Sequence, residues 1–144
     1  MPGMKALHCS DTLSQHRPWR QQRTSRREQE MVRFLHTADW QLGKPYGRVT
    51  DPGKQARLRQ ARYDAIGRIA GLAAEQQSCF VLIAGDLFDA TAPTRSDVSR
   101  ACSAIGRIPC PVFVIPGNHD HGGPGSLWEE AYFCDEQRSL AKNM

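Results

Sequence analysis

Three short apolar runs, rich in β-branched and aromatic residues, constrain the fold of this chain more than any other feature. They are "MVRFLHT" at 31–37, "CFVLIAG" at 79–85 and "PVFVIPG" at 111–117. Short continuous runs of this kind are typical of strands in a sheet. The second and third contain almost no polar residue, which predicts strands that are covered on both faces.

The segments between these runs have the spacing of amphipathic helices. In residues 54–77, and again in residues 94–107, apolar side chains lie three or four positions apart. Ser126 is the predicted N-cap of a last helix, with Glu129 three positions on as its capping-box partner. The order strand–helix–strand–helix–strand–helix predicts an α/β fold with a parallel sheet and right-handed crossovers.

Most of the net charge of +4 lies at the start of the chain. Residues 1–30 hold six basic and three acidic side chains, which leaves a net charge of only +1 on residues 31–144. The later part therefore has no strong electrostatic footprint for nucleic acid. The first 30 residues lack periodicity, and we expect a disordered basic extension. The alternatives are an arginine-rich targeting peptide and sequence upstream of a true start at Met31.

Neither the apolar runs nor the cysteines point to a membrane or to an oxidising compartment. No apolar run approaches the roughly 20 residues that a bilayer span needs. The five cysteines include no CxxC pair, which argues against a disulfide framework and a structural zinc site. We expect a cytoplasmic protein that does not contact a membrane, in which Cys79 and Cys110 are buried small hydrophobes.

A polar motif follows each apolar run: "TADWQ" at 37–41, "AGDLFD" at 84–89 and "PGNHDHGG" at 116–123. Because parallel strands bring their carboxyl ends to one edge of a sheet, we expect Asp39, Asp86 and Asn118 to converge there. An Asp after a single strand is more often a turn or cap residue. Three such motifs at successive strand ends instead indicate one site.

Oxygen donors with a few imidazoles suit manganese, iron or zinc, and a pair of cations needs a bridging carboxylate. Asp86, beside flexible Gly85, is the predicted bridge. We expect Asp39 to bind the first metal and the Asn118 side-chain oxygen to bind the second. His119 is the predicted catalytic residue, which would bring positive charge or a proton to the phosphate oxygens.

These motifs resemble those of the calcineurin-like metallophosphoesterase family, D-x-H, G-D-x-x-D and G-N-H-[DE]. Here they stand as "DWQ" at 39–41, "GDLFD" at 85–89 and "GNHD" at 117–120. Two longer stretches, "FLHTADWQLGKPY" and "LIAGDLFDATAPT", are most similar to the opening of DNA-repair exonucleases of the SbcD type. The resemblance implies that residues 31–144 are the N-terminal, parallel βαβαβα portion of a metallophosphoesterase sandwich.

The resemblance also implies a function. It implies a two-metal hydrolase, with Mn²⁺ as the expected ion and exonucleolytic cleavage of DNA as the expected reaction. The implied partners are an SMC-like ATPase of the SbcC type and a second copy of the chain. The alternatives are a phosphomonoesterase or small-molecule phosphodiesterase of the same superfamily, and an inactive truncated fragment.

Gln41 stands where the family motif has a histidine. It is either a variant metal ligand that favours manganese, which is the interpretation we prefer, or a non-ligand beside a weakened site. The family pattern continues with further histidines, whereas His121 is the only histidine after His119 in this chain. We expect His121 to be a loop residue, and the chain to be interrupted within a larger fold.

Other residues near the motifs have simpler expected roles. Lys44, Tyr46 and Arg48 could contact a phosphate backbone, but a solvated loop face is the favoured interpretation. Trp40 is expected to pack under the site, and Trp128 to anchor the last helix.

Overall fold

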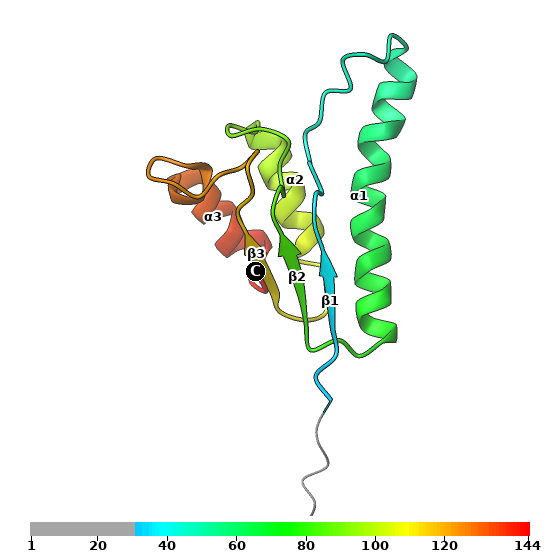
Figure 1. Cartoon of the computed structure of the whole chain (residues 1–144), viewed down its shortest axis with the longest axis vertical. Coiled ribbons are helices and arrows are strands. Elements are labelled where there is room, and N and C mark those ends of the chain that lie inside the picture. The colour runs from blue at the N-terminus through cyan, green and yellow to red at the C-terminus, as the bar shows by residue number, and fades with distance from the viewer. Residues whose placement is uncertain (1–30) are drawn as a thin grey trace, which may run out of the picture. The chain divides into compact units, whose positions relative to one another are not determined.

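The computed structural model describes residues 31–144, which form a three-stranded parallel sheet with interleaved helices (Figure 1). The strands are β1 (Phe34–Thr37), β2 (Phe80–Ala84) and β3 (Val112–Ile115), in the order β1-β2-β3. This confirms the predicted α/β fold with a parallel sheet. The predictions for residues 1–30 lie outside the described residues.

The register of the sheet sets where the three strands end. Thr37 pairs with Ile83 across β1 and β2, and Ala84 pairs with Ile115 across β2 and β3. The carboxyl ends of all three strands are therefore level, and the segments that follow them leave the sheet at the same edge.

The helices begin where the sequence supplies a capping side chain. Helix α1 (Pro52–Glu75) follows Asp51, whose carboxylate accepts from the backbone N–H groups of Gly53 at 2.8 Å and Lys54 at 3.1 Å. Helix α2 (Arg95–Ile105) follows Thr94, whose hydroxyl oxygen accepts from the Asp97 N–H at 3.1 Å. Such caps satisfy donors that have no partner within the helix.

The predicted capping box of the last helix is wrong. Ser126 precedes a short 3₁₀ turn, η1 (Leu127–Glu129), and its buried hydroxyl has no hydrogen-bond partner among residues 31–144. The Glu129 carboxylate accepts from the Gly125 N–H at 2.8 Å. Because extended backbone at Glu130 interrupts the turn, α3 (Ala131–Leu140) begins only after it.

Trp128 anchors this last helix, as the sequence predicted. Its indole N–H donates to the Asp120 carbonyl at 2.6 Å, and its ring lies edge-on to Phe133 of α3 with centroids 5.1 Å apart. The contact ties α3 to the loop that carries the third motif.

The core lies between the helices and one face of the sheet. Val81 and Ile83 of β2 are fully buried against residues of α1 and α2 such as Ile66 and Val98. Val112 of β3 joins the same core. The other helix residues in this core include Ala73, Ala101, Cys102, Ala104 and Ile105.

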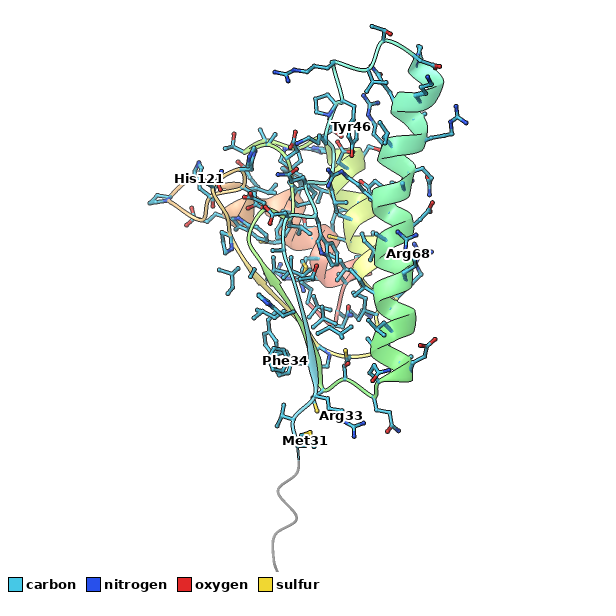
Figure 2. All side chains as sticks on the ribbon, turned by 45° about the vertical axis from the view of Figure 1, so that its right-hand side comes forward. Met31, Arg33, Phe34, Tyr46, Arg68 and His121 are labelled. Atoms are coloured by element: carbon cyan, nitrogen blue, oxygen red, sulfur yellow. The ribbon has the colours of Figure 1, made fainter. Side chains whose placement is uncertain are left out.

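The other face of the sheet is not covered within residues 31–144. Phe34, Phe80 and Phe113, one from each strand, form a continuous aromatic row on it, with ring centroids 4.8 and 5.5 Å apart. Phe34 is 49% exposed and Phe113 is 56% exposed, and Figure 2 shows Phe34 on the side of the sheet away from α1. The prediction that β2 and β3 are covered on both faces is therefore wrong for the described residues.

The cysteines also differ from expectation. Cys79 is exposed and Cys110 is half-buried, because both lie just before their strands, at the open amino-terminal edge of the sheet. The buried thiol is that of Cys102 on α2, where burial, and secondarily Glu136, raises its pKa to about 11. No helix within residues 31–144 is long and apolar enough to cross a membrane.

Candidate metal centre

The first two strand-end motifs continue the sheet beyond β1 and β2. The Asp39 N–H donates to the Gly85 carbonyl at 3.1 Å, and the Gln41 N–H donates to the Asp86 carbonyl at 2.8 Å. A β-bridge joins Leu42 to Phe88 further along. These contacts hold the two motifs side by side.

Backbone strain marks both motifs. Asp39, Gln41 and Asp86 all have positive φ angles, of 54°, 43° and 53°. A residue with a side chain pays of order 1–3 kcal/mol for a sparsely populated backbone conformation, and such residues cluster at functional sites. Two backbone hydrogen bonds, from Asp39 to Gly85 and from Gln41 to Asp86, join the strained segments.

The third motif docks onto Asp86. One carboxylate oxygen of Asp86, Oδ1, accepts from the His119 N–H at 2.9 Å. The same oxygen would lie only 2.0 Å from a Cβ atom added at Gly117, so only glycine fits at that position. The glycine of "GNHD" therefore allows the second and third motifs to approach each other.

Asp120 holds the second and third motifs together through hydrogen bonds. Its side chain is only 1% exposed, and its two oxygens accept from the Gly117 N–H at 2.7 Å and the Phe88 N–H at 3.0 Å. The sequence motifs did not predict this role. The only indication in the sequence was the carboxylate of Asp120 within the third motif. A carboxylate that is buried there needs hydrogen-bond donors as partners.

Asp39, Asp86 and Asn118 line one depression of about 300 Å³, together with Gly85 and Gly117. Asp86 is buried, whereas Asp39 and Asn118 are exposed. The structure thus brings together three of the four predicted metal ligands, one from each motif.

In chemical type this donor set suits divalent cations. Two carboxylates and one amide oxygen are hard donors, which suit Mn²⁺ or Mg²⁺ completed by water. Within residues 31–144, no group of three or more His, Cys, Asp or Glu side chains is arranged to hold a metal ion. The depression thus brings together three oxygen donors, although the described residues form no such group of acidic, histidine or cysteine side chains.

The fourth predicted ligand, Gln41, is engaged elsewhere. Its side-chain oxygen accepts a hydrogen bond from the Lys44 ammonium at 2.9 Å. Lys44 also forms an ion pair with Asp89, the last residue of "GDLFD", with a nitrogen–oxygen distance of 2.8 Å. Lys44 is therefore half-buried and held by both of the first two motifs.

His119 lies against the second motif. Its ring nitrogen Nδ1 is 3.0 Å from the Asp89 backbone carbonyl. When Nδ1 carries the proton it donates to that oxygen, and Nε2 remains available for other partners. His121 is an exposed loop residue, as expected, and Figure 2 shows it at the margin of the molecule.

The remaining loop residues are fixed by α1. Trp40 is buried under the site, as predicted, and its indole N–H donates to the Thr37 hydroxyl at 3.0 Å. Tyr46 accepts from the Arg62 guanidinium at 2.6 Å, while Arg48 is exposed. A solvated loop face was expected for Lys44, Tyr46 and Arg48, and only Arg48 is exposed, whereas Lys44 and Tyr46 are half-buried.

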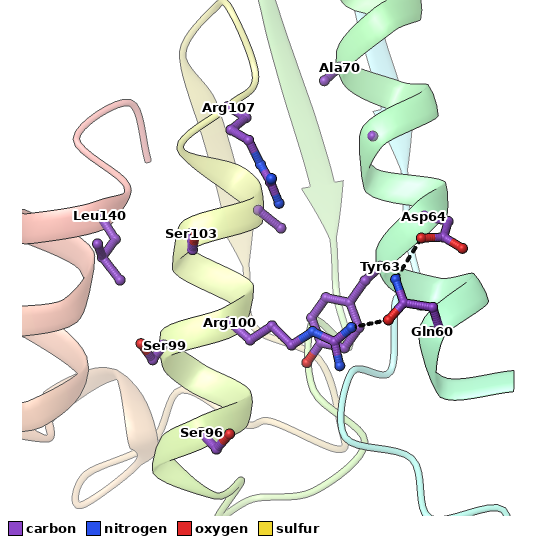
Figure 3. A pocket seen from close by; sticks show the side chains of 12 residues that line it. Gln60, Tyr63, Asp64, Ala70, Ser96, Ser99, Arg100, Ser103, Arg107 and Leu140 are labelled. Atoms are coloured by element: carbon purple, nitrogen blue, oxygen red, sulfur yellow. Dashed lines mark hydrogen bonds between the residues drawn. The ribbon is translucent and has the colours of Figure 1, made fainter. Parts of the chain in front are cut away.

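A larger groove of about 930 Å³ lies between α1 and α2, away from the strand ends. Figure 3 shows Arg100 over the ring of Tyr63, with its guanidinium carbon 3.8 Å from the ring centroid, and hydrogen-bonded to Gln60. Burial, and secondarily Asp97, raises the pKa of Tyr63. The groove contains none of the strand-end residues.

The three parallel strands end at the same level, and the residues that follow them bring acidic and amide oxygens to one depression. The protein is therefore an α/β protein with a candidate metal centre. The model of the calcineurin-like phosphoesterase family matches residues 32–142, and the chain belongs to that family. Its members are hydrolases that depend on metal ions, generally two.

Proposed function

We propose that this protein is a metal-dependent phosphodiesterase that acts on DNA ends, as an exonuclease of the SbcD type. The observation that supports metal-dependent hydrolysis most is the convergence of Asp39, Asp86 and Asn118 on one depression. DNA as the substrate rests on the likeness of "FLHTADWQLGKPY" and "LIAGDLFDATAPT" to such exonucleases.

In this proposal Asp39, Asp86 and Asn118 hold a divalent cation, with Mn²⁺ as the expected ion. The bound cation supplies Lewis-acid chemistry and lowers the pKa of a water molecule. The protein's part is to keep these oxygens in place. Gly117 lets the third motif approach Asp86, and the His119 N–H fixes one oxygen of the Asp86 carboxylate.

His119 is the proposed catalytic side chain. Its Nδ1 is anchored at the Asp89 carbonyl, which leaves Nε2 to carry a proton toward a phosphate or leaving-group oxygen. An imidazolium there would also stabilise negative charge that develops in the transition state. The proposed macromolecular partners are DNA, an SMC-like ATPase of the SbcC type and a second copy of the chain.

The test is Mn²⁺-dependent release of nucleotides from end-labelled double-stranded DNA by the purified chain. Asp86→Asn should lower the rate at least about 100-fold, because the variant loses the charge of the central ligand. Asp135→Asn, on the exposed face of α3, is the matched control and should retain the full rate.

Two results would contradict the proposal. An Asp86→Asn variant as active as the wild type would show that the metal centre takes no part in the reaction. Hydrolysis of small phosphate monoesters without cleavage of DNA would instead favour a phosphomonoesterase.

A further inference from the structure

The amino-terminal edge of the sheet places two thiols beside each other. Val81 of β2 pairs with Val112 of β3, so counting back two residues on each strand aligns Cys79 with Cys110. The Val81 N–H also donates to the Pro111 carbonyl at 2.9 Å, which joins the two strand starts. Both strands start at the edge of the sheet away from the strand-end motifs (Figure 1). Neighbouring strands lie about 4.8 Å apart, within the range of about 4.4–6.8 Å between the α-carbons of a disulfide.

Hydrogen bonds hold the backbone of both cysteines at this edge. The Cys79 N–H donates to the Arg33 carbonyl at 2.7 Å, which fixes the start of β2 beside the residue that precedes β1. The Asn143 side-chain amide donates to the Cys110 carbonyl at 3.3 Å, which fixes the start of β3. The positions of the two cysteines are therefore set by the fold and need no bond between the thiols.

The two thiols differ in their access to solvent. Cys79 is exposed, whereas Cys110 is half-buried. Burial raises the pKa of the Cys110 thiol, and the neighbouring Cys79 raises it further. Cys102, by contrast, is buried on α2 with its pKa raised to about 11, so it holds too little thiolate for exchange at neutral pH. Cys79 is thus the thiol of this pair that an external reagent reaches first.

We propose that Cys79 and Cys110 are a redox modification site, which a small-molecule disulfide such as oxidised glutathione converts to a cross-strand disulfide. The Cys79 thiolate attacks one sulfur of the small disulfide, whose S–S bond breaks and releases one small thiol. The Cys110 thiolate then attacks the Cys79 sulfur, forms the protein disulfide and releases the second small thiol. The two cysteines lose two protons and two electrons in all, and the small disulfide is reduced to two thiols.

The crosslink would join the two strands that lead to the second and third motifs. From Cys79 the chain runs through β2 to Asp86, and from Cys110 it runs through β3 to Asn118. Because the thiols lie at the amino ends of these strands, their oxidation changes no residue of the candidate metal centre. The inference therefore does not rest on the proposed function.

The experiment exposes the folded full-length chain to oxidised glutathione, stops the reaction by alkylation and measures the intact mass. Every variant carries Cys9→Ser, because Cys9 lies outside the described residues. The parent chain should lose two hydrogens from Cys79 and Cys110 and retain no glutathione at either, as fragmentation of its peptides would show. A dithiol reductant should restore both thiols. Cys134→Ser, on α3, is the matched control and should form the same crosslink.

Two further variants test the order of the steps. Cys110→Ser should stop at the mixed disulfide and retain one glutathione on Cys79. In Cys79→Ser, Cys110 should take up glutathione at least about tenfold more slowly, because its thiol is half-buried and forms less thiolate. Equal rates for the two thiols would overturn the assigned order.

The pairing itself is tested in the folded and the unfolded chain. Circular dichroism establishes that each variant is folded, and in concentrated urea the preference for this pair should be lost. Glutathione that stays on Cys79 of the folded parent chain would overturn the proposal. A crosslink from Cys79 to Cys134, or between two chains, in place of the bond to Cys110 would do the same.

Discussion

At the scale of single residues, Asp120 shows how a buried charge shapes the site without entering it. Both of its oxygens accept backbone N–H groups, one from the third motif and one from the second. Hydrogen bonds to a carboxylate are stronger than bonds between neutral groups. Asp120 therefore sets the distance between Asp86 and the "GNHD" loop.

Asp120→Ala should lower the free energy of unfolding by about 2–4 kcal/mol, because it leaves two backbone donors without partners. Asp120→Asn keeps one acceptor oxygen and should lose about half as much. Urea unfolding followed by circular dichroism measures both. Equal urea midpoints for Asp120→Ala and the wild type would show that these two hydrogen bonds do not stabilise the fold.

At the scale of elements, two glycines in different settings make a matched pair. Gly117 lies in the turn after β3, where an added Cβ would meet Asp86 Oδ1 at 2.0 Å. Gly67 lies within α1, where an added Cβ would meet nothing within 4 Å. The same substitution should therefore have opposite consequences at the two positions.

Gly67→Ala should stabilise the protein by about 0.5–1 kcal/mol, because glycine costs that much within a helix. Gly117→Ala should displace the Asp86 carboxylate and weaken Mn²⁺ binding at least about tenfold, since this equals only 1.4 kcal/mol of lost ligand geometry. Thermal unfolding and calorimetry measure the two effects. Unchanged Mn²⁺ affinity in Gly117→Ala would contradict the inference that glycine is needed for the third motif to approach Asp86.

At the scale of the whole molecule, residues 31–144 place their core on one side of the sheet. The buried face of β2 contacts α1 and α2. Among these residues, Phe34 and Phe113 of the aromatic row are exposed and Phe80 between them is half-buried. Contiguous apolar surface of this kind favours association with other apolar surfaces.

Phe113→Ala should cost only about 1 kcal/mol of stability, because it removes one edge-on aromatic contact and little buried area. It should also lower the binding of an apolar fluorescent dye. Phe133→Ala, at a position on α3 that is 5% exposed, should cost about 3–5 kcal/mol. Urea unfolding and dye fluorescence compare the two. A larger loss for Phe113→Ala would mean that the aromatic row is buried.

The sequence by itself determined the elements and the converging part of the site. Apolar runs and helical spacing are local patterns, so they predicted the three strands and the first two helices within a few residues of their observed ends. Asp39, Asp86 and Asn118 could be grouped because parallel strands align their carboxyl ends whatever their side chains.

The tertiary structure alone decided the features that depend on residues far apart in the chain. The ion pair between Lys44 and Asp89 spans 45 residues, and the bond from Phe88 to Asp120 spans 32. Gln41 faces Lys44 for the same reason, since its environment is set by a neighbouring loop and not by its own motif. Periodicity identifies which residues a strand buries, but only packing decides what covers each face, and so the aromatic row and Cys79 are exposed.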